Sequence, residues 1–389
     1  MKLKISYYLS HPIQYFSPLL KEMNKEFDLQ VYYFSDASVK GNVDVGFGRN
    51  VQWDTPLLEG YYYTFLKNLS KRKSLSNRMW DVVNPSVIKT LFQSNSSIVI
   101  VNGWSYFSNL LVIITAKLSG KKVWLRAENP LNQELLKNRK LRTVKKLILK
   151  FFLFPFVSKF LYIGKQSRLF FEYYGVKPSR LIYTPYAVDN DWFQKEAAVL
   201  KDKYAIKQEL GLPVNKKVIL FTGKYIEKKK PLDLLKAFNL MEPGDTTLVM
   251  VGEGMLREEM ETYIDEHALK NVVLTGFINQ SAITKYYAAA DVFVMCSGPG
   301  ETWGLSVNEA MNFGLPVVVS KTCGCADDLV HEDENGFLFE EGDIGALSDA
   351  VKRLLDNEHL REAYGAASLQ IIKDFSVKHI VQNMKEAIG

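Results

Sequence analysis

The stretch Val292–Ser320, VFVMCSGPGETWGLSVNEAMNFGLPVVVS, contains a complete strand–helix–strand pattern. Its two ends, Val292–Cys296 and Pro316–Ser320, are short valine-rich runs of the kind that form buried strands. Between them, a glycine-marked loop leads into what looks like the start of a helix. A strand followed by a crossover helix and a second strand predicts a parallel sheet.

The same alternation of apolar runs and helical patterns continues along nearly the whole chain. It predicts further strands at Leu3–Leu9, Leu29–Phe34, Ser97–Val101, Lys122–Leu125, Phe160–Ile163, Arg180–Tyr183, Lys217–Thr222, Thr247–Gly252 and Val272–Thr275. A chain of 389 residues, 47% of them hydrophobic, is long for a single core. We therefore expect an α/β protein with two doubly wound parallel sheets that face each other across a cleft.

A polar segment after Phe193 suggests where the first domain ends. We place an N-terminal Rossmann-like domain at residues 1–195 and a second one at residues 196–375. Residues 376–389 form a closing helix with apolar residues on one face, and we expect it to pack back toward the N-terminal domain.

The loop after the expected strand Lys217–Thr222 combines a glycine with several lysines. Gly223 lets the backbone approach a ligand, and Lys224 and Lys229 supply ammonium groups suited to a diphosphate. A solvated basic turn is the alternative interpretation. Ligands of open sheets bind at the carboxyl ends of strands, which favours a site in this loop. Gly276 and Phe277 follow another strand, and there a flat group can lie against the main chain.

Glu301 and Glu309 lie on either side of an expected helix start at Gly304. The amide groups of Leu305 and Ser306 at that start can bind an anion, while the two carboxylates can accept hydrogen bonds from hydroxyl groups. A capping box formed by Ser306 and Glu309 is a second interpretation. It does not explain Glu301, whereas a ligand that is polar at both ends and anionic in the middle does.

This segment resembles the donor-site signature of glycosyltransferase family 4, the retaining GT-B glycosyltransferases. The resemblance rests on these stretches: Glu301-x7-Glu309, Trp303-Gly304-Leu305, Asn308-Glu309-Ala310-Met311, Gly314-Leu315-Pro316-Val317, Asn335-Gly336-Phe337, Val251-Gly252-Glu253-Gly254 and Ala290-Asp291-Val292-Phe293. Lys224 and Lys229 match the family's diphosphate-binding Arg and Lys. The matching blocks run from Val218 to Leu347.

The resemblance implies transfer of a hexose-type sugar from a nucleoside diphosphate sugar to an acceptor hydroxyl on a glycan or lipid-linked saccharide, with retention of configuration. It implies no metal and no other cofactor. Lys224, Lys229 and the helix start would stabilise the leaving diphosphate. Glu301 and Glu309 would bind and position the donor, and we group these four residues as the catalytic set.

The N-terminal half offers weaker candidates for contact with the acceptor or the sugar. The stretch Ser10–Leu19, which contains His11 and Gln14, resembles the first strand-to-helix loop of one subgroup of the family. Arg126 and Glu128 lie where many members carry a histidine. A purely structural role for His11 remains open.

The sequence also bears on four other functions. A dinucleotide-dependent oxidoreductase needs a Gly-x-Gly-x-x-Gly loop, and the nearest match, Gly252-x-Gly254, continues with Arg257. A metal-dependent transferase of another fold would use an Asp-x-Asp motif, and Asp189-Asn190-Asp191 has that form. A sugar-nucleotide epimerase of the same fold and a noncatalytic nucleotide-sugar-binding module stay open.

The net charge of +6 indicates an anionic partner. Residues 137–156 place seven Lys or Arg residues beside aromatic ones and contain no acid, which suggests peripheral contact with an anionic membrane. The alternative is that the aromatics belong to the core. Nucleic acid is not expected. With no signal peptide, no membrane span and only three cysteines, expected to be reduced, we predict a cytoplasmic protein, peripheral at the membrane face if this contact forms.

Overall fold

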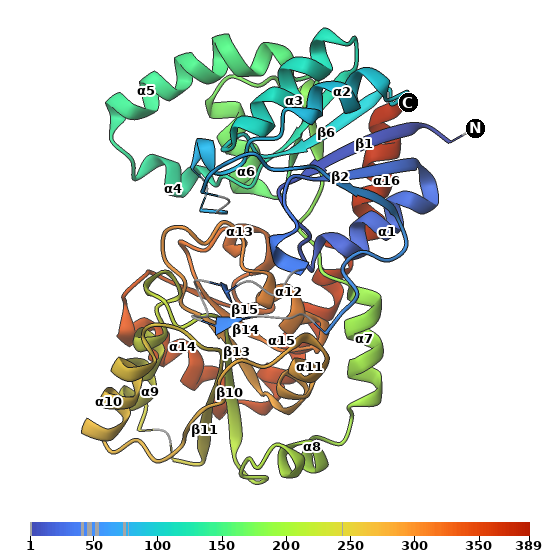
Figure 1. The fold of residues 1–389 in the computed structure, drawn as a ribbon. Coiled ribbons are helices and arrows are strands. Elements are labelled where there is room, and N and C mark those ends of the chain that lie inside the picture. The colour runs from blue at the N-terminus through green and yellow to red at the C-terminus, as the bar shows by residue number, and fades with distance from the viewer. Residues whose placement is uncertain are drawn as a thin grey trace. The chain divides into compact units, whose positions relative to one another are not determined.

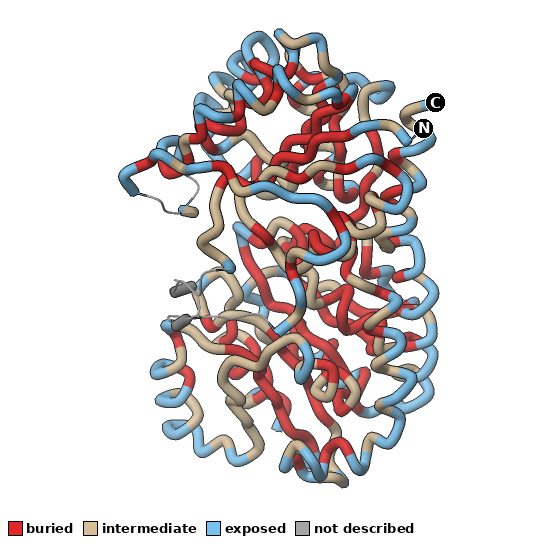
Figure 2. The backbone as a smooth tube through the Cα atoms, turned by 45° about the vertical axis from the view of Figure 1, so that its right-hand side comes forward, coloured by how far each residue is buried: buried red, intermediate tan, exposed pale blue. Residues whose placement is uncertain are grey.

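The computed structural model describes residues 2–39, 43–44, 49–50, 54–72, 75–76, 78–242 and 244–389. The chain divides into two compact units, the first comprising Met1–Asn42, Pro56–Pro185 and Val377–Gly389, and the second Val43–Thr55 and Tyr186–Ser376. Each unit is built on its own parallel sheet, whose strands are the most buried part of the trace (Figure 2). The expectation of two Rossmann-like α/β domains is confirmed.

Seven described strands form the sheet of the first unit, in the order β5-β2-β1-β6-β7-β8-β9, with every neighbouring pair parallel. The strands are β1 (Lys4–Leu9), β2 (Asp28–Tyr33), β5 (Tyr62–Phe65), β6 (Ile98–Asn102), β7 (Lys122–Arg126), β8 (Lys159–Tyr162) and β9 (Leu181–Tyr183). The central strands β1, β6 and β7 are almost continuously buried, as expected for a parallel sheet covered on both faces.

Helices connect these strands and cover the sheet (Figure 1). They are α1 (Phe16–Glu26), α2 (Ser86–Gln93), α3 (Phe107–Leu118), α4 (Leu131–Leu135), α5 (Arg139–Ile148), α6 (Lys165–Tyr173) and α16 (Val377–Ile388). Short turns lie at η1 (Ala37–Val39), η2 (Met79–Asp81), η3 (Leu149–Leu153), η4 (Phe154–Phe156) and η5 (Pro178–Arg180).

The C-terminal helix α16 belongs to the first unit. It packs beside α1, where Lys385 Nζ and Glu26 Oε2 lie 2.6 Å apart. Asn383 donates from its side-chain amide to the carbonyl of Tyr183 in β9 at 3.0 Å. Ile380, Val381 and Met384 are buried, so the apolar side of this helix faces the unit.

Six described strands form the second sheet, in the order β12-β11-β10-β13-β14-β15, again all parallel. They are β10 (Lys217–Thr222), β11 (Thr246–Val251), β12 (Val272–Leu274), β13 (Val292–Met295), β14 (Val317–Ser320) and β15 (Gly336–Phe339). Residues of a short antiparallel pair, β3 (Val43–Asp44) and β4 (Arg49–Asn50), also group with this unit.

The helices of the second unit surround this sheet on both faces (Figure 1). They are α7 (Asn190–Val199), α8 (Lys203–Glu209), α9 (Pro231–Leu240), α10 (Arg257–Glu266), α11 (Gln280–Ala289), α12 (Leu305–Asn312), α13 (Ala326–Leu329), α14 (Ile344–Asp356) and α15 (Glu358–Ile371), with turns η6 (Glu227–Lys229) and η7 (Ile372–Asp374). Throughout the described parts of the chain, every helix is too short or too polar to span a bilayer.

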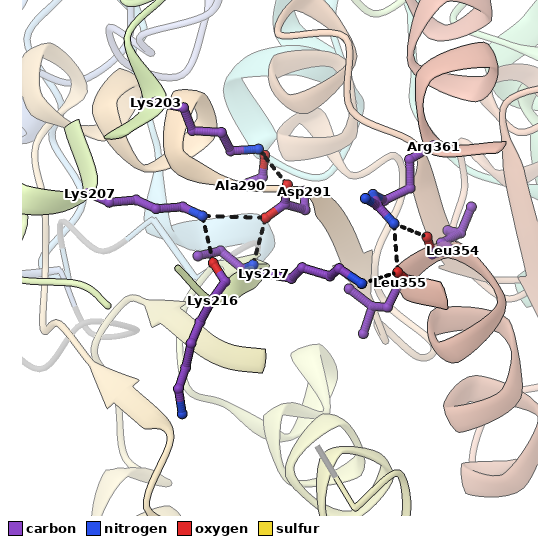
Figure 3. Close-up of polar contacts among 10 residues, drawn as sticks. Lys203, Lys207, Lys216, Lys217, Ala290, Asp291, Leu354, Leu355 and Arg361 are labelled. Atoms are coloured by element: carbon purple, nitrogen blue, oxygen red, sulfur yellow. Dashed lines mark hydrogen bonds and ion pairs between the residues drawn. The ribbon is translucent and has the colours of Figure 1, made fainter. Parts of the chain in front are cut away.

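Lysines and one aspartate form polar contacts at the amino-terminal ends of strands in the second sheet (Figure 3). Asp291, directly before β13, accepts hydrogen bonds from the backbone N–H of Val218 at 2.7 Å and from Lys203 Nζ at 2.6 Å. Lys207 Nζ lies 3.8 Å from the same carboxylate and donates to the carbonyl of Lys216 at 2.6 Å. Because Lys203 and Lys207 belong to α8, Asp291 joins that helix to β10 and β13.

Candidate functional site

The second sheet reverses its winding between β10 and β13. These two strands are neighbours, and the strands that follow each of them are added on opposite sides. The carboxyl ends of such a pair form the crevice where open α/β sheets bind ligands. The lysine loop, Gly223–Lys230, follows β10, and the loop Cys296–Gly304 follows β13, so the two predicted loops leave the sheet side by side.

The lysine loop ends in the turn η6 before Pro231 begins α9. Lys230 adopts a left-handed backbone conformation (φ 51°), and proline at the first helical position has no N–H to leave unpaired. The side chain of Lys229 passes Gly223, with its Cδ 3.6 Å from the position that a β-carbon there would occupy. Lys224 lies in the same loop and is partly buried.

Lys229 and Glu301 form a buried ion pair. Lys229 Nζ lies 2.5 Å from Glu301 Oε2, and the two side chains are only 15% and 10% exposed. Burial opposes the charge of the lysine, but the carboxylate outweighs it and raises the pKa of Lys229. Burial likewise opposes the charge of Glu301, whose pKa is lowered by Lys229 and by Lys228, 3.6 Å away. Each partner therefore keeps the other charged.

The loop after β14 holds Glu301 and the residues after it in place. Gly324 donates its N–H to the carbonyl of Glu301 at 3.1 Å, and Cys325 donates to the carbonyl of Trp303 at 3.0 Å. A β-carbon at residue 324 would lie 1.9 Å from the carbonyl oxygen of Thr302. Only glycine allows this close approach, so Gly324 sets the position of the Glu301 loop.

The cysteines are free thiols, all buried. Cys323 donates from its thiol to the carbonyl of Trp303 at 2.9 Å, and its Sγ lies 3.7 Å from that of Cys325. Burial raises the pKa of Cys325 well above its usual value. Cys323 and Cys325 thus lie against the loop that carries Glu301 and Trp303 and help to pack it.

Helix α12 begins at Leu305, and its N-cap is Gly304 in a left-handed conformation (φ 109°). A β-carbon at Gly304 would lie 2.6 Å from Met295 Sδ. No side chain caps this helix start. The capping-box interpretation is therefore wrong: Ser306 is the second helical residue, and Glu309 is buried and bonded elsewhere. The first amides of α12 point to the end of the β13 loop, as at any helix start.

Glu309 is buried in a chain of hydrogen bonds. Tyr287 of α11 donates its hydroxyl hydrogen to Glu309 Oε2 at 2.6 Å, and Thr222 Oγ1, at the end of β10, lies 2.9 Å from the same Tyr287 oxygen. Burial raises the pKa of Glu309 to about 7, although the bonds from Tyr287 and Gln280 and the charge of Lys229 act in the opposite direction. Lys229 thus interacts with both predicted glutamates.

Trp303 and Asn308 of the signature have a structural task. Trp303 donates its indole N–H to the Asn308 side chain at 2.8 Å, and Asn308 donates to the carbonyl of Tyr186 at 3.0 Å. The ring of Tyr186 stacks on Trp303. These contacts fix α12 against the beginning of the second unit.

The glycines after β11 serve contacts between loops. A β-carbon at Gly252 would lie 1.8 Å from the carbonyl oxygen of Gly223, and one at Gly254 would lie 2.4 Å from that of Tyr225. Gly252 also donates its N–H to the carbonyl of Gly276 at 3.1 Å. The predicted donor-binding residue Gly276 is thereby joined to the lysine loop through Gly252, and Phe277, partly buried, follows it.

The Asp189-Asn190-Asp191 motif is explained by local structure. Asp189 caps α7, accepting a hydrogen bond from the N–H of Trp192 at 3.1 Å. Asn190 donates to the carbonyls of Ile372 and Phe375, at 3.1 Å each. These contacts give the motif a structural role without a ligand.

The predicted residues of the first unit lie where strands of its sheet end. His11 follows β1 and has its Nδ1 2.9 Å from Ser10 Oγ. Arg126 ends β7, is buried, and lies over the ring of Phe16 at 5.1 Å. Glu128 and Gln14 are partly buried nearby in sequence.

Burial raises the pKa of Tyr7 to about 12, while the charge of Arg126 opposes this rise and that of Glu128 adds to it. Arg126 and Glu128 therefore lie close enough to Tyr7 of β1 to affect its ionisation.

Sequence reasoning missed Thr222 and Tyr287, which hold Glu309, and Gly324, which positions Glu301. Thr222 ends a predicted strand, and ligands of open sheets bind at the carboxyl ends of strands, so its position in the sequence indicated a place near the site. Tyr287 and Gly324 come from other elements, and their roles become visible only when the elements pack together.

Comparison with known proteins finds similarity over the second half of the chain. Residues 202–370 match the model of the family described as glycosyl transferases group 1. A sulfoquinovosyl transferase of Arabidopsis thaliana is 34% identical over 155 residues, covering 39% of this chain and 29% of that protein. A phosphatidyl-myo-inositol mannosyltransferase of Mycobacterium leprae is 33% identical over 175 residues, covering 44% and 46%.

An Escherichia coli galactosyltransferase, named as acting from UDP-Gal on an α-D-GlcNAc-diphosphoundecaprenol, is 29% identical over 218 residues, 54% of each chain. The matches thus span about half or less of each relative's length. Among solved structures, Anabaena HepE in complex with UDP and glucose shares the fold with a TM-score of 0.72, at 20% identity and over 99% of both chains. Residues 202–370 of this chain are thus similar to the glycosyl transferases group 1 family.

Proposed function

We propose that this protein is a retaining glycosyltransferase that moves a hexose-type sugar from a nucleoside diphosphate sugar to an acceptor hydroxyl, without a metal ion. The acceptor class is a glycan or a lipid-linked saccharide. The names of the M. leprae and E. coli relatives, which include a phosphatidylinositol and a diphosphoundecaprenol, support an acceptor of this class.

One observation carries the proposal: Lys229 pairs with buried Glu301 and acts on buried Glu309 at the switch point of the second sheet. Two buried carboxylates and a buried ammonium are expensive to maintain for stability alone, because each charge loses hydration. Such groups are typical of a site that binds a polar ligand. The start of α12 lies between the two glutamates in sequence and adds an anion-binding backbone.

In the proposed step, the acceptor oxygen forms a bond to the anomeric carbon while the bond from that carbon to the phosphate oxygen breaks. The acceptor's proton passes to the departing phosphate oxygen, and the nucleoside diphosphate leaves. Attack on the face that the phosphate leaves retains the configuration. Lys229, Lys224 and the amides of Leu305 and Ser306 stabilise the developing charge on the diphosphate.

The two glutamates have positioning roles in this proposal. Glu309 accepts hydrogen bonds from ribose hydroxyls, and Glu301 from hydroxyls of the transferred sugar, as their acceptor oxygens permit. Gly223, Gly304, Gly276 and Phe277 leave room for the nucleotide. From the first unit, His11, Gln14, Arg126 and Glu128 are proposed to contact the sugar or the acceptor.

The first test is donor binding. Purified protein is screened against nucleotide sugars that include UDP-glucose, UDP-galactose and GDP-mannose, and the thermal unfolding temperature is recorded. One donor should raise it, because ligands that bind only the folded state stabilise it by mass action. Glu301→Gln should bind the nucleotide moiety but lose most of the preference for the sugar, whereas the exposed Glu362→Gln serves as the matched control and should behave as wild type.

The second test is turnover. With the stabilising donor and a polyprenyl-diphosphate saccharide or a soluble glycan, the anomeric configuration of the new linkage is determined by NMR, with and without EDTA. We expect a retained linkage at an unchanged rate in EDTA. An inverted product, an EDTA-sensitive rate, or an epimerised donor formed without acceptor would each contradict a separate part of the proposal.

A further inference from the structure

Helix α5 presents its apolar side to the solvent. Leu141, Val144, Leu147 and Ile148 are 67%, 54%, 52% and 51% exposed. Their spacing of three and four residues places them along one face of the helix. A surface helix of a globular protein normally turns such a face toward the core. In α5 the apolar face points to the solvent instead.

The same exposed surface continues beyond the helix. Phe151 and Phe152, in the turn η3, are 60% and 73% exposed, while Leu149 and Leu153 between and after them are buried. The alternative, in which the aromatic residues belong to the core, therefore holds only for part of the segment. We call Leu141, Val144, Leu147, Ile148, Phe151 and Phe152 the α5 apolar face.

Lys145 and Lys146 of α5 contact the rest of the first unit, although the side chain of Lys146 stays exposed. Lys145 Nζ lies 2.9 Å from Glu134 Oε1 and 4.8 Å from the ring centre of Phe170. Lys146 lies over the ring of Tyr173 at 5.1 Å. The Glu134 side chain is only 2% exposed and also accepts a hydrogen bond from Tyr174, at 2.7 Å.

Burial raises the pKa of Glu134, but the hydrogen bonds from Tyr174 and the neighbouring lysines outweigh it and bring the pKa to about 2. Glu134 therefore stays ionised at neutral pH and holds Lys145 inward. This ion pair fixes the rotation of α5, so the outward direction of the apolar face is built into the fold.

Exposed cations flank the apolar face. Residues 137–150 contain seven Lys or Arg residues and no acid, and Lys137, Arg139, Lys140, Lys146 and Lys150 are exposed. Figure 1 shows α5 at the side of the first unit away from α1 and α16, where no other described helix covers it. An apolar stripe bordered by cations complements a membrane surface that carries anionic headgroups.

We propose that the α5 apolar face inserts into the surface of an anionic lipid bilayer, with the flanking lysines and arginines at the headgroups. A helix of 10 residues is about 15 Å long and lies in the plane of the interface rather than across the bilayer. The second unit has no comparable face in its described part: its exposed large apolar residues, such as Leu240 and Met255, lie singly on different elements. Insertion of this face into a bilayer does not require the transfer reaction.

The test is flotation of the full chain with vesicles. Vesicles of phosphatidylcholine with about 30% phosphatidylglycerol are compared with phosphatidylcholine alone, at low and high salt. The wild type should float with the anionic vesicles and be partly released by salt. The double substitution Leu147→Glu with Phe151→Glu should lower the partition coefficient at least about tenfold, because it removes two inserted side chains and adds two negative charges.

The matched control is Leu240→Glu with Met255→Glu, which alters two exposed apolar residues of the second unit (59% and 76% exposed). It should float like the wild type, and circular dichroism should show that both double variants are folded. Equal flotation of the wild type and the α5 variant would overturn the proposal. Lipid-free association of the wild type that the α5 variant loses would do so too, because it assigns the face to a second copy of the chain.

Neither outcome depends on donor or acceptor. A protein that binds vesicles but transfers no sugar refutes only the proposed function, and one that transfers sugar to a soluble glycan without binding vesicles refutes only the membrane surface.

Discussion

Replacing Glu309 with glutamine should stabilise the protein at neutral to alkaline pH and weaken its binding of the donor. The substitution keeps the shape of the side chain and an oxygen that accepts the hydrogen bond from Tyr287. It removes only the ability to ionise. The experiment therefore separates the cost of the buried charge from the cost of a lost contact.

The magnitude follows from the raised pKa of Glu309, about 7 against an ordinary 4.5. The folded protein holds this proton more tightly than the unfolded chain, so stability is complete below about pH 4.5 and falls as the pH rises to about 7. Each pH unit corresponds to about 1.4 kcal/mol, so the ionised carboxylate costs about 3 kcal/mol in full. Between about pH 5.5 and pH 8, the expected loss is about 2 kcal/mol.

The assay is urea unfolding of the wild type and Glu309→Gln at both pH values, followed by fluorescence and circular dichroism. The difference in free energy of unfolding between the two proteins should grow by about 2 kcal/mol in favour of the variant on going to about pH 8. The exposed Glu362→Gln should show no such growth.

Donor binding is then measured by calorimetry at about pH 8. There the variant should bind the donor at least about tenfold more weakly, because a neutral amide replaces a charged acceptor of hydrogen bonds. A difference in stability that does not change with pH would refute the ionisation argument. A more stable variant with unchanged donor affinity would refute the ligand-binding role of Glu309.

Three further predictions follow from particular contacts. Lys229→Met should abolish transfer and lower the free energy of unfolding by about 3 kcal/mol, because it leaves Glu301 buried without its lysine. Lys229→Met combined with Glu301→Gln should regain most of that stability but no transfer. Equal stability of the single and the double variant would contradict this prediction. Asp291→Ala should lower the free energy of unfolding in urea by about 2 kcal/mol and leave donor affinity unchanged, because its hydrogen bonds lie at the opposite end of the strands from the site. A selective loss of donor binding would contradict this structural role of Asp291. Gly324→Ala should weaken donor binding by moving the Glu301 loop, while Gly345→Ala, where a β-carbon meets only ordinary contacts, should bind as wild type in the same calorimetric assay.

The central strands were predictable from the sequence, and their ends differ from the structure by at most one residue. A strand buried on both faces must be a continuous apolar run, and this pattern is local. The edge strands β5 and β15 were missed. β5 reads Tyr-Tyr-Thr-Phe and is mostly exposed, so its sequence lacks the signature of a buried strand.

Part of the candidate site was likewise predictable from the sequence, and part was not. Glu301, Glu309 and Lys229 were identified from residue type and from their place after strands, because the carboxyl ends of parallel strands meet at one edge. Sequence spacing could not show that Lys229 pairs with Glu301, nor that Tyr287 holds Glu309, since these partners are separated by tens of residues and meet only through packing.

The sequence by itself determined the two parallel sheets, the loops that carry the charged residues and the cationic character of residues 137–150. Only the tertiary structure decided how those charges behave. Burial and pairing fix the ionisation of Glu301 and Glu309, and the ion pair of Glu134 with Lys145 fixes which side of α5 meets the solvent. Hydrophobic periodicity indicates that a helix has an apolar and a polar face. Which of the two faces the solvent depends on the side chains that pack against the helix in the folded protein.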